Sequence, residues 1–159
     1  GLDMWRVPKT IIERSPPGVL RSDAERAWAQ FRDPAQSGVV VVTLPEEMPT
    51  NESLELCGAL RTELQLPLLA LVVDQVVPTI FEAAERDALA DMAEPTETDA
   101  ASLALAAGIR RAAREQVQAQ SLARLASLNA PLFQLPFLVE GAASLSAVGK
   151  LVAALASQR

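Results

Sequence analysis

Two uninterrupted runs of apolar residues stand out in the pattern of hydrophobic and polar positions along the chain. Gly38–Leu44 and Pro67–Asp74 each lead into a polar loop that contains a proline, and a segment with a helical pattern separates them. Continuous runs of this length, rich in valine and leucine, are typical of strands buried on both faces of a parallel sheet. We therefore predict a βαβ unit, in which ligands are bound by the loops at the carboxyl ends of the strands.

The rest of the pattern predicts a third strand, Leu132–Leu138, and several helices. A capping box at Ser22–Glu25 and an N-cap at Thr79 open two of the helices. Gly1–Pro17 is rich in proline and glycine, and we expect it to be irregular apart from one helical turn at Leu2–Arg6. The predicted helices cover residues 22–32, 50–65, 79–92, 99–128 and 142–157. This order predicts an α/β fold, a parallel sheet with helices on both faces, in a single domain over residues 1–159.

Composition and charge exclude several classes of protein. The net charge of −6 argues against a nucleic-acid partner, and the absence of histidine removes the commonest general base and metal ligand, so we predict no metal site. A self-contained hydrolase of the usual kind is therefore not expected. A single cysteine, Cys57, cannot form an internal disulfide, which favours a cytoplasmic location. No apolar run reaches the roughly 20 residues that cross a bilayer, and no signal peptide is evident, so direct membrane insertion is not expected.

The two strand-end loops resemble a known family. VVTLPEEMPTNESLEL, a helix, and then LPLLALVVDQVVP are similar to the C-terminal half of the arsenite-pump-driving and tail-anchored-protein-targeting ATPases. That family consists of dimeric P-loop ATPases with a doubly wound parallel sheet. Ala112–Leu138, with its Arg- and Gln-rich helix followed by Leu-Pro, keeps the order of the family, and GLDMWRVP at the start resembles the segment that follows its switch motif.

The resemblance implies that this chain is the C-terminal portion of a larger ATPase domain that acts as a homodimer with ATP as its ligand. The Gly-rich phosphate loop, its lysine and the residue that binds Mg²⁺ would lie upstream, so Mg²⁺ would be held only by that half. No G-x-x-x-x-G-K-[ST] motif occurs in this sequence, and Gly149-Lys150 has the wrong spacing. We predict no catalytic residue here and expect this chain alone to be inactive.

The resemblance also implies a set of nucleotide-binding residues. Asp74 and Gln75 stand where the family places an asparagine that recognises adenine. An amide can donate to N7 of adenine and accept from its N6 amino group, whereas an ionised aspartate only accepts, so Gln75 would have to supply the donor. The stretch with Pro136, Phe137 and Val139 resembles the loop that flanks adenine, although the Arg-Gly pair of the family is missing. Asp74 as a turn cap, and Pro136-Phe137 as the end of a buried strand, remain alternatives.

A second loop, at the end of the first strand, is implied to face the nucleotide and the partner subunit. It contains Thr43, Pro45 and Glu46, followed by Glu47. The alternative is that both glutamates are solvated and that Asn51 caps the next helix. The arginines of the long helix form either solvated faces or a contact with another domain or subunit; they are Arg110, Arg111, Arg114 and Arg124.

Two other functions remain open at this point. One is a non-catalytic α/β interaction module that has lost nucleotide binding, which Asp74 and the missing Arg-Gly pair favour. The other is an unrelated small-molecule-binding domain that uses the same crevice at the strand ends. The lone Cys57 has no counterpart to the metalloid-binding cysteines of the arsenite-pump branch; we expect it to be a core residue on one helix face with Leu54, Leu60 and Leu64.

Overall fold

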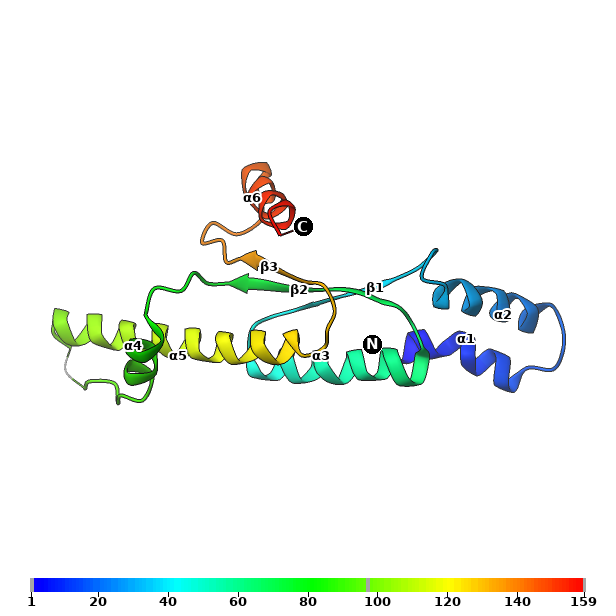
Figure 1. The fold of residues 1–159 in the computed structure, drawn as a ribbon, viewed down its shortest axis with the longest axis horizontal. Helices are drawn as coiled ribbons and strands as arrows, with labels where there is room; N and C mark the ends of the chain where they lie inside the picture. Colours follow the sequence, from blue (N-terminus) through cyan, green and yellow to red (C-terminus); the bar gives the residue numbers. More distant parts are fainter. Residues whose placement is uncertain (1, 97, 159) are drawn as a thin grey trace.

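The protein is an α/β fold built on a three-stranded parallel sheet, as seen in a computed structural model that describes residues 2–96 and 98–158 (Figure 1). The strands are β1 (Val39–Thr43), β2 (Leu68–Val76) and β3 (Leu132–Pro136), in the order β1-β2-β3. Both pairs are parallel, with Val41 opposite Leu71 and Val72 opposite Phe133. The three predicted strands and their parallel arrangement are therefore confirmed. That the sheet is half of a doubly wound fold stays a prediction.

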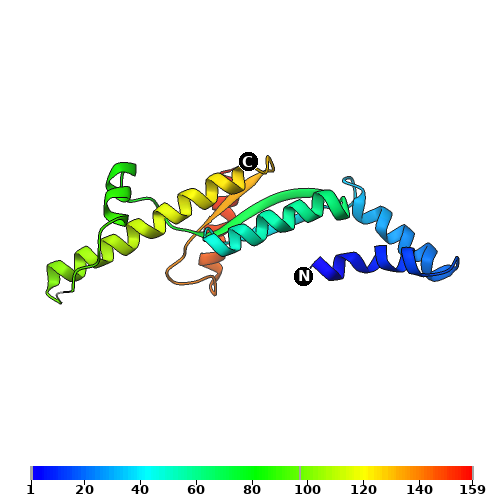
Figure 2. The same ribbon diagram turned by 90° about the horizontal axis from the view of Figure 1, so that it is seen from below.

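The helices that connect the strands lie on one face of this sheet. The connection from β1 to β2 runs through α3 (Glu47–Ala59) and the π-helical turn η1 (Leu60–Leu64). The connection from β2 to β3 runs through α4 (Ala83–Ala90) and α5 (Ala100–Ala126). Figure 2, seen from below, shows α3 and α5 in front of the strands and α6 (Leu145–Ala156) behind them. Helices thus occur on both faces as predicted, but only α6 lies on the second face, against β3.

The first part of the chain corrects the sequence prediction. Residues expected to be irregular form α1 (Leu2–Arg14), which packs against α2 (Val19–Arg32) as a helical hairpin. Pro8 lies inside α1 and cannot donate to the carbonyl four residues earlier. Packing against α2, and the 2.6 Å ion pair from Arg6 to Glu63 of η1, favour the helix over local propensity. Between residues 2 and 18, the irregular part is the turn at residues 15–18.

Several helix starts also differ from the prediction; α6, for example, begins at Leu145 and not near residue 142. Helix α2 begins at Val19 after Gly18, so the Ser22–Glu25 box lies inside the helix. Helix α4 begins after Glu82, whose N–H donates to Oε2 of Glu85 at 3.1 Å, rather than at Thr79. Helix α3 starts before Pro49, because proline is tolerated in the first turn, where the N–H has no helical partner. Asn51 is therefore no cap; its Oδ1 accepts from Arg124 of α5 at 2.6 Å.

The core lies between the sheet and the helices α3 and η1. Cys57 is 2% exposed and packs with Leu60 and Leu64, which confirms its predicted core position, and burial raises the pKa of its thiol. Leu54, the fourth residue of that predicted face, is only half-buried. Trp28 and Phe31 of α2 pack against the same cluster and join the hairpin to the sheet.

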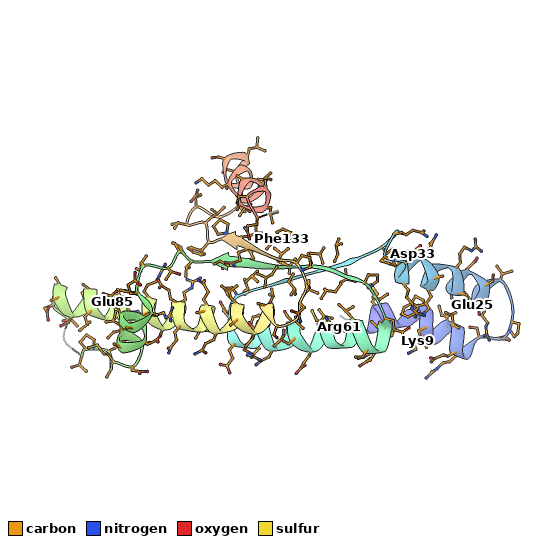
Figure 3. All side chains as sticks on the ribbon, in the orientation of Figure 1. Lys9, Glu25, Asp33, Arg61, Glu85 and Phe133 are labelled. Carbon is orange, nitrogen blue, oxygen red and sulfur yellow. The ribbon has the colours of Figure 1, made fainter. Side chains whose placement is uncertain are left out.

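The molecule is elongated, with the hairpin at one end and α4 at the other. In Figure 3, Lys9 and Glu25 mark the hairpin and Glu85 marks the opposite end. The chain exposes 10208 Å², whereas a compact monomer of 17.0 kDa exposes about 7,700 Å². Part of the excess is apolar: Val40, Val42 and Leu69, on the sheet face away from α3, are 46%, 65% and 62% exposed.

Candidate functional site

The carboxyl ends of the three strands form one edge of the sheet, and the predicted site residues lie at this edge. Parallel pairing brings the loops after Thr43, Val76 and Pro136 to the same side. Helix α5 runs beneath them and contacts β2 (Figure 1). Side chains from β2, the loop after β3 and α5 therefore approach one another.

A β-bulge at Asp74-Gln75 shapes this edge. The pairs Val73–Gln134 and Val76–Pro136 enclose two residues on β2 but one on β3. Gln75 takes up the extra length with a φ of 60°, in the left-handed region, which is uncommon for a residue other than glycine. Its N–H donates to Oδ1 of Asp74 at 2.8 Å, so the other carboxylate oxygen of Asp74 has no hydrogen bond within the described chain. Such bulges re-aim side chains and recur beside binding sites.

A cavity of about 280 Å³ opens beside the bulge. Of the five residues expected to bind nucleotide, Asp74, Gln75, Pro136 and Phe137 line it, whereas Val139 is 88% exposed and does not. The opposite wall comes from the loop after β3 and from α6, where the lining residues are Leu138, Gly141, Ala142 and Leu151. Gly141 adopts a φ of 70°, a conformation that glycine takes without strain. The ion pair between Glu140 and Lys150 holds this loop to α6 and lowers the pKa of Glu140.

Arg114 of α5 reaches this site, whereas the sequence analysis assigned it to a solvated helix face or to a contact with another domain or subunit. Its guanidinium carbon lies 5.1 Å from the centre of the Phe137 ring, a cation–π contact. Within the chain that the structure describes, no carboxylate forms an ion pair with Arg114. Its charge is therefore available close to the cavity, although the Arg-Gly pair expected after β3 is missing.

The loop after β1 lines a neighbouring cavity of about 480 Å³ together with Gln75 and Arg114. Pro45 and Glu46 contribute to this wall. Thr43 does not, since its side chain is buried and its hydroxyl donates to the carbonyl of Pro49 at 3.1 Å. Thr43 therefore shapes the loop from inside, Glu46 lines the second cavity, and Gln75 lines both cavities.

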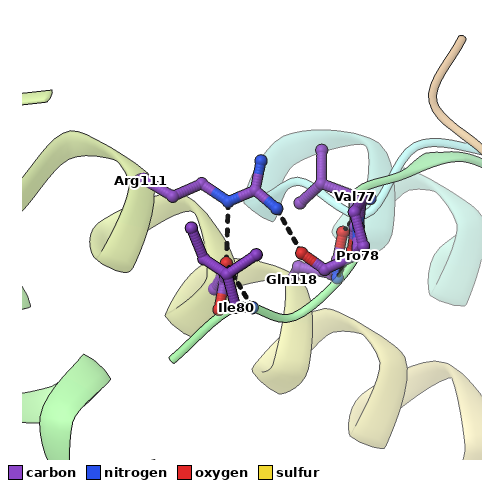
Figure 4. A network of polar contacts seen from close by, with 6 residues as sticks. Val77, Pro78, Ile80, Arg111 and Gln118 are labelled. Atoms are coloured by element: carbon purple, nitrogen blue, oxygen red, sulfur yellow. Dashed lines mark hydrogen bonds and ion pairs between the residues drawn. The ribbon is translucent and has the colours of Figure 1, made fainter. Parts of the chain in front are cut away.

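A polar network fixes the segment that follows the bulge (Figure 4). The side chain of Gln118 accepts from the Val77 N–H at 2.8 Å and donates to the Val77 carbonyl at 2.9 Å. Glu115, 2% exposed, accepts from the Ile80 N–H at 3.2 Å and from Nε of Arg111 at 2.7 Å. Arg111 also donates to the carbonyl of Pro78. The end of β2 is thereby clamped onto α5, which limits the movement of Asp74 and Gln75.

The ionisation of Glu115 reflects two opposing effects. Burial favours the neutral acid, but the hydrogen bond from Arg111, the backbone N–H groups of Ile80 and Phe81, and the charge of Arg111 outweigh it, so the pKa of Glu115 falls below its usual value of 4.5. Glu115 is therefore an ionised structural anchor rather than a proton donor near neutral pH.

A sequence signal for this clamp exists in α5. The buried positions of that helix recur every three or four residues and change from apolar to polar side chains partway along. They are Ala106, Ile109, Ala112, Glu115, Gln118, Ser121 and Leu125. Polar residues on the buried stripe of a helix indicate internal hydrogen bonds rather than solvated faces.

The described residues contain neither a candidate metal-binding group nor a helix that could span a membrane. Across residues 2–96 and 98–158, no group of three or more cysteine or acidic side chains could hold a metal ion. In the same ranges, no helix combines the length and the apolar character needed to cross a bilayer. Compared with known proteins, the sequence matches no family model and no curated protein.

Proposed function

We propose that this chain supplies the loops that contact the adenine base in an ATPase that resembles the arsenite-pump-driving and tail-anchored-protein-targeting family. One observation carries the proposal: four residues that the resemblance assigns to nucleotide binding, from two segments about 60 residues apart, line one cavity at the carboxyl edge of a parallel sheet. ATP is the proposed ligand, with its phosphates and Mg²⁺ held by a separate, upstream part of the ATPase.

The cavity lining supplies both a hydrogen-bond acceptor and a hydrogen-bond donor for an adenine ring. The unpaired oxygen of Asp74 would accept from the N6 amino group, and the side-chain amide of Gln75 would donate to N7. Pro136 and Phe137 would cover the ring, while Arg114 holds Phe137 in place from α5. The carboxylate of Asp74 repels N7 of adenine at close range. Asp74 and Gln75 together should therefore bind adenine more weakly than the asparagine amide of the family does.

The loop with Pro45 and Glu46 is proposed to face the nucleotide and a partner subunit. The second cavity supports this proposal, because the loop lines it together with Gln75 and Arg114. Gln75 also lines the first cavity. A homodimer closed over the nucleotide would place this loop at the interface between subunits.

The test is a titration with adenosine, monitored through the chemical shifts of the backbone amides. Adenosine tests the base site without requiring a phosphate cradle, so we expect shifts confined to residues 74–75 and 136–142. Asp74→Asn should tighten binding by about tenfold, because a well-made bidentate contact with adenine is worth about 1–3 kcal/mol. Asp74→Ala, the matched control, should change affinity little.

Two outcomes would contradict the proposal. Equal affinities for the wild type and Asp74→Asn would place Asp74 outside the base pocket. A wild-type preference for guanosine would mean that Asp74 accepts from the N1 and N2 donors of guanine, and the adenine assignment would be wrong.

A non-catalytic interaction module is the second candidate, and the exposed apolar sheet face favours it. Val40, Val42 and Leu69 are much more exposed than the valines and leucines of the core. This candidate predicts no adenosine shifts in either the wild type or Asp74→Asn.

A further inference from the structure

The first cavity is small for a whole nucleoside. Its volume of about 280 Å³ lies just below the range of about 300–1,000 Å³ that is usual for small-molecule sites. A base bound there would therefore leave its ribose outside, in a space that adjoins the cavity. The second cavity, of about 480 Å³, is one such space, because Gln75 lines both cavities.

A third cavity, of about 410 Å³, also adjoins the first, through Pro136 and Phe137. The rest of its lining contains no charged side chain and consists of Val76, Val77, Pro78, Gln134 and Ala154. The backbone N–H and carbonyl of Gln134 are already bonded to the side-chain amide of Gln158, both at 2.8 Å. Burying a hydroxyl without a hydrogen-bond partner costs free energy, so this mostly apolar cavity does not suit a sugar.

The second cavity, in contrast, contains two side chains of opposite charge, Glu46 and Arg114. Within the part of the chain that the structure describes, neither forms an ion pair. Glu46 is the N-cap of α3, and its carbonyl accepts from the Thr50 N–H at 3.0 Å, but its carboxylate makes no capping hydrogen bond. Arg114 lies over the ring of Phe137, and in the same part of the chain its N–H groups donate to no acceptor. Both charged groups are therefore available to a ligand.

The other walls of the second cavity are apolar or already bonded. Ala113 and Val117 of α5 contribute alkyl groups, against which the carbon atoms of a sugar ring can pack. Gln118 also lines the cavity, but its side-chain amide is bonded to the N–H and the carbonyl of Val77, at 2.8 and 2.9 Å. The polar side chains left for a ligand are those of Gln75, Glu46 and Arg114.

We propose that the second cavity binds the ribose of the nucleotide whose base occupies the first, an inference that rests on the proposed base site. The two neighbouring hydroxyls of the ring donate to the carboxylate of Glu46, and one of them also accepts from the guanidinium of Arg114. A carboxylate only accepts and a guanidinium only donates, whereas a hydroxyl does both, so a pair of neighbouring hydroxyls satisfies the two side chains together. Glu46 thereby makes the site specific for ribonucleotides.

The test compares adenosine with 2′-deoxyadenosine, which lacks one of the two hydroxyls. The deoxynucleoside should bind the wild type about tenfold more weakly, because hydrogen bonds to a charged group are among the stronger ones. Affinity is the readout, followed at the amides of residues 74–75. Glu46 and Arg114 reach the ribose through the ends of long side chains, so their own backbone amides should move little.

The outcomes separate this inference from the base site on which it rests. Equal affinities for the two nucleosides, with clear shifts at residues 74–75, would overturn the ribose site and leave the base site standing. No shift at residues 74–75 with either nucleoside would overturn both.

Glu46→Ala should remove the discrimination and bind the two nucleosides with nearly equal affinity. Glu47→Ala is the matched control, because Glu47 carries the same charge in the first turn of α3 but does not line the cavity. It should keep the preference for adenosine. A preference that persists in Glu46→Ala, or one that Glu47→Ala loses to the same extent, would contradict the role of Glu46.

The side-chain Nε–H signal of Arg114 tests the second contact in the wild type. Free adenine controls for the effect of a bound base on Phe137 and its neighbour Arg114. The signal should therefore shift further with adenosine than with adenine. Equal shifts at saturation would exclude a hydrogen bond from Arg114 to the ribose and overturn the proposed arrangement.

Discussion

At the scale of single residues, Gln75 is the most unusual position in the chain. Three residues other than glycine have a positive φ: Gln65, Gln75 and Asn129 in the described ranges. Gln65 ends η1 and Asn129 follows α5, where left-handed residues commonly terminate helices. Gln75 instead lies within a strand and lines both cavities. Backbone strain retained at a cavity suggests a role in ligand contact rather than in chain reversal.

Gln75→Gly tests this role. Glycine adopts a positive φ without strain, so the free energy of unfolding should rise slightly or stay level, by up to about 1 kcal/mol. Adenosine binding should weaken, because the donor of the side-chain amide is lost. Gln65→Gly is the control: it should affect stability similarly and leave adenosine binding unchanged. Urea unfolding and the amide-shift titration measure the two effects, and unchanged binding in Gln75→Gly would remove Gln75 from the site.

At the scale of elements, the contact between α5 and the end of β2 determines how well the site is ordered. Gln118 and Glu115 bond backbone groups of residues 77–80, which have no strand partner of their own. Buried backbone groups without partners are costly, so these two side chains replace a missing stretch of sheet. Arg124 and Asn51 add a contact between α5 and α3 further along.

Glu115→Gln should make stability less dependent on acid pH. The pKa of Glu115 is lower in the folded state than its usual value, so the folded state binds fewer protons, and the stabilisation is present above about pH 4.5 and lost as pH falls through the folded-state value. At neutral pH the variant should lose about 1.5–3 kcal/mol, the worth of hydrogen bonds to a charged group. In acid, the difference between the two proteins should shrink.

The measurement is urea unfolding at a series of pH values. Glu94→Gln is the control, because Glu94 pairs with Arg110 at 2.7 Å on the surface, and exposed pairs contribute about 0–1 kcal/mol. A constant difference between the wild type and Glu115→Gln from neutral to acid pH would show that the charge of Glu115 does not stabilise the fold.

At the scale of the whole molecule, the sheet is covered unevenly. Helices α3 and α5 occupy one face, while α6 is the helix on the other and contacts β3 (Figure 1). The hairpin of α1 and α2 extends beyond the strands instead of covering them. The exposed valines of β1 and the excess surface follow directly from this arrangement.

Hydrolysis is the property that the whole chain should lack. Phosphoryl transfer depends on a phosphate-binding loop and Mg²⁺, and this sequence has no G-x-x-x-x-G-K-[ST] motif. Incubation with Mg-ATP should therefore release no phosphate above buffer, measured colorimetrically across chain concentrations. Turnover that co-purifies with the chain and increases with its concentration would contradict this expectation.

The sequence by itself determined the elements whose patterns are long and uniform. The apolar runs predicted β1, β2 and β3 to within about two residues, and α5 begins about where it was predicted. Its N-cap is Asp99, whose carboxylate accepts from the N–H of Ala101 at 2.9 Å. The alternation of strands and helices along the chain predicted a parallel sheet, and with it a site at the carboxyl edge of that sheet. These features follow from local periodicity and capping, which depend on neighbours in the sequence.

Only the tertiary structure decided the rest. Helix α1 forms despite Pro8 because α2 and Glu63, distant in sequence, pack against it. Arg114 approaches Phe137, and Glu115 and Gln118 turn inwards, because α5 passes beneath the end of β2. The open β1 edge likewise depends on which strand is outermost. Each of these outcomes is set by contacts between segments far apart in the chain. The local pattern of α5 indicates that Glu115 and Gln118 lie on its buried stripe, but not which groups they bond.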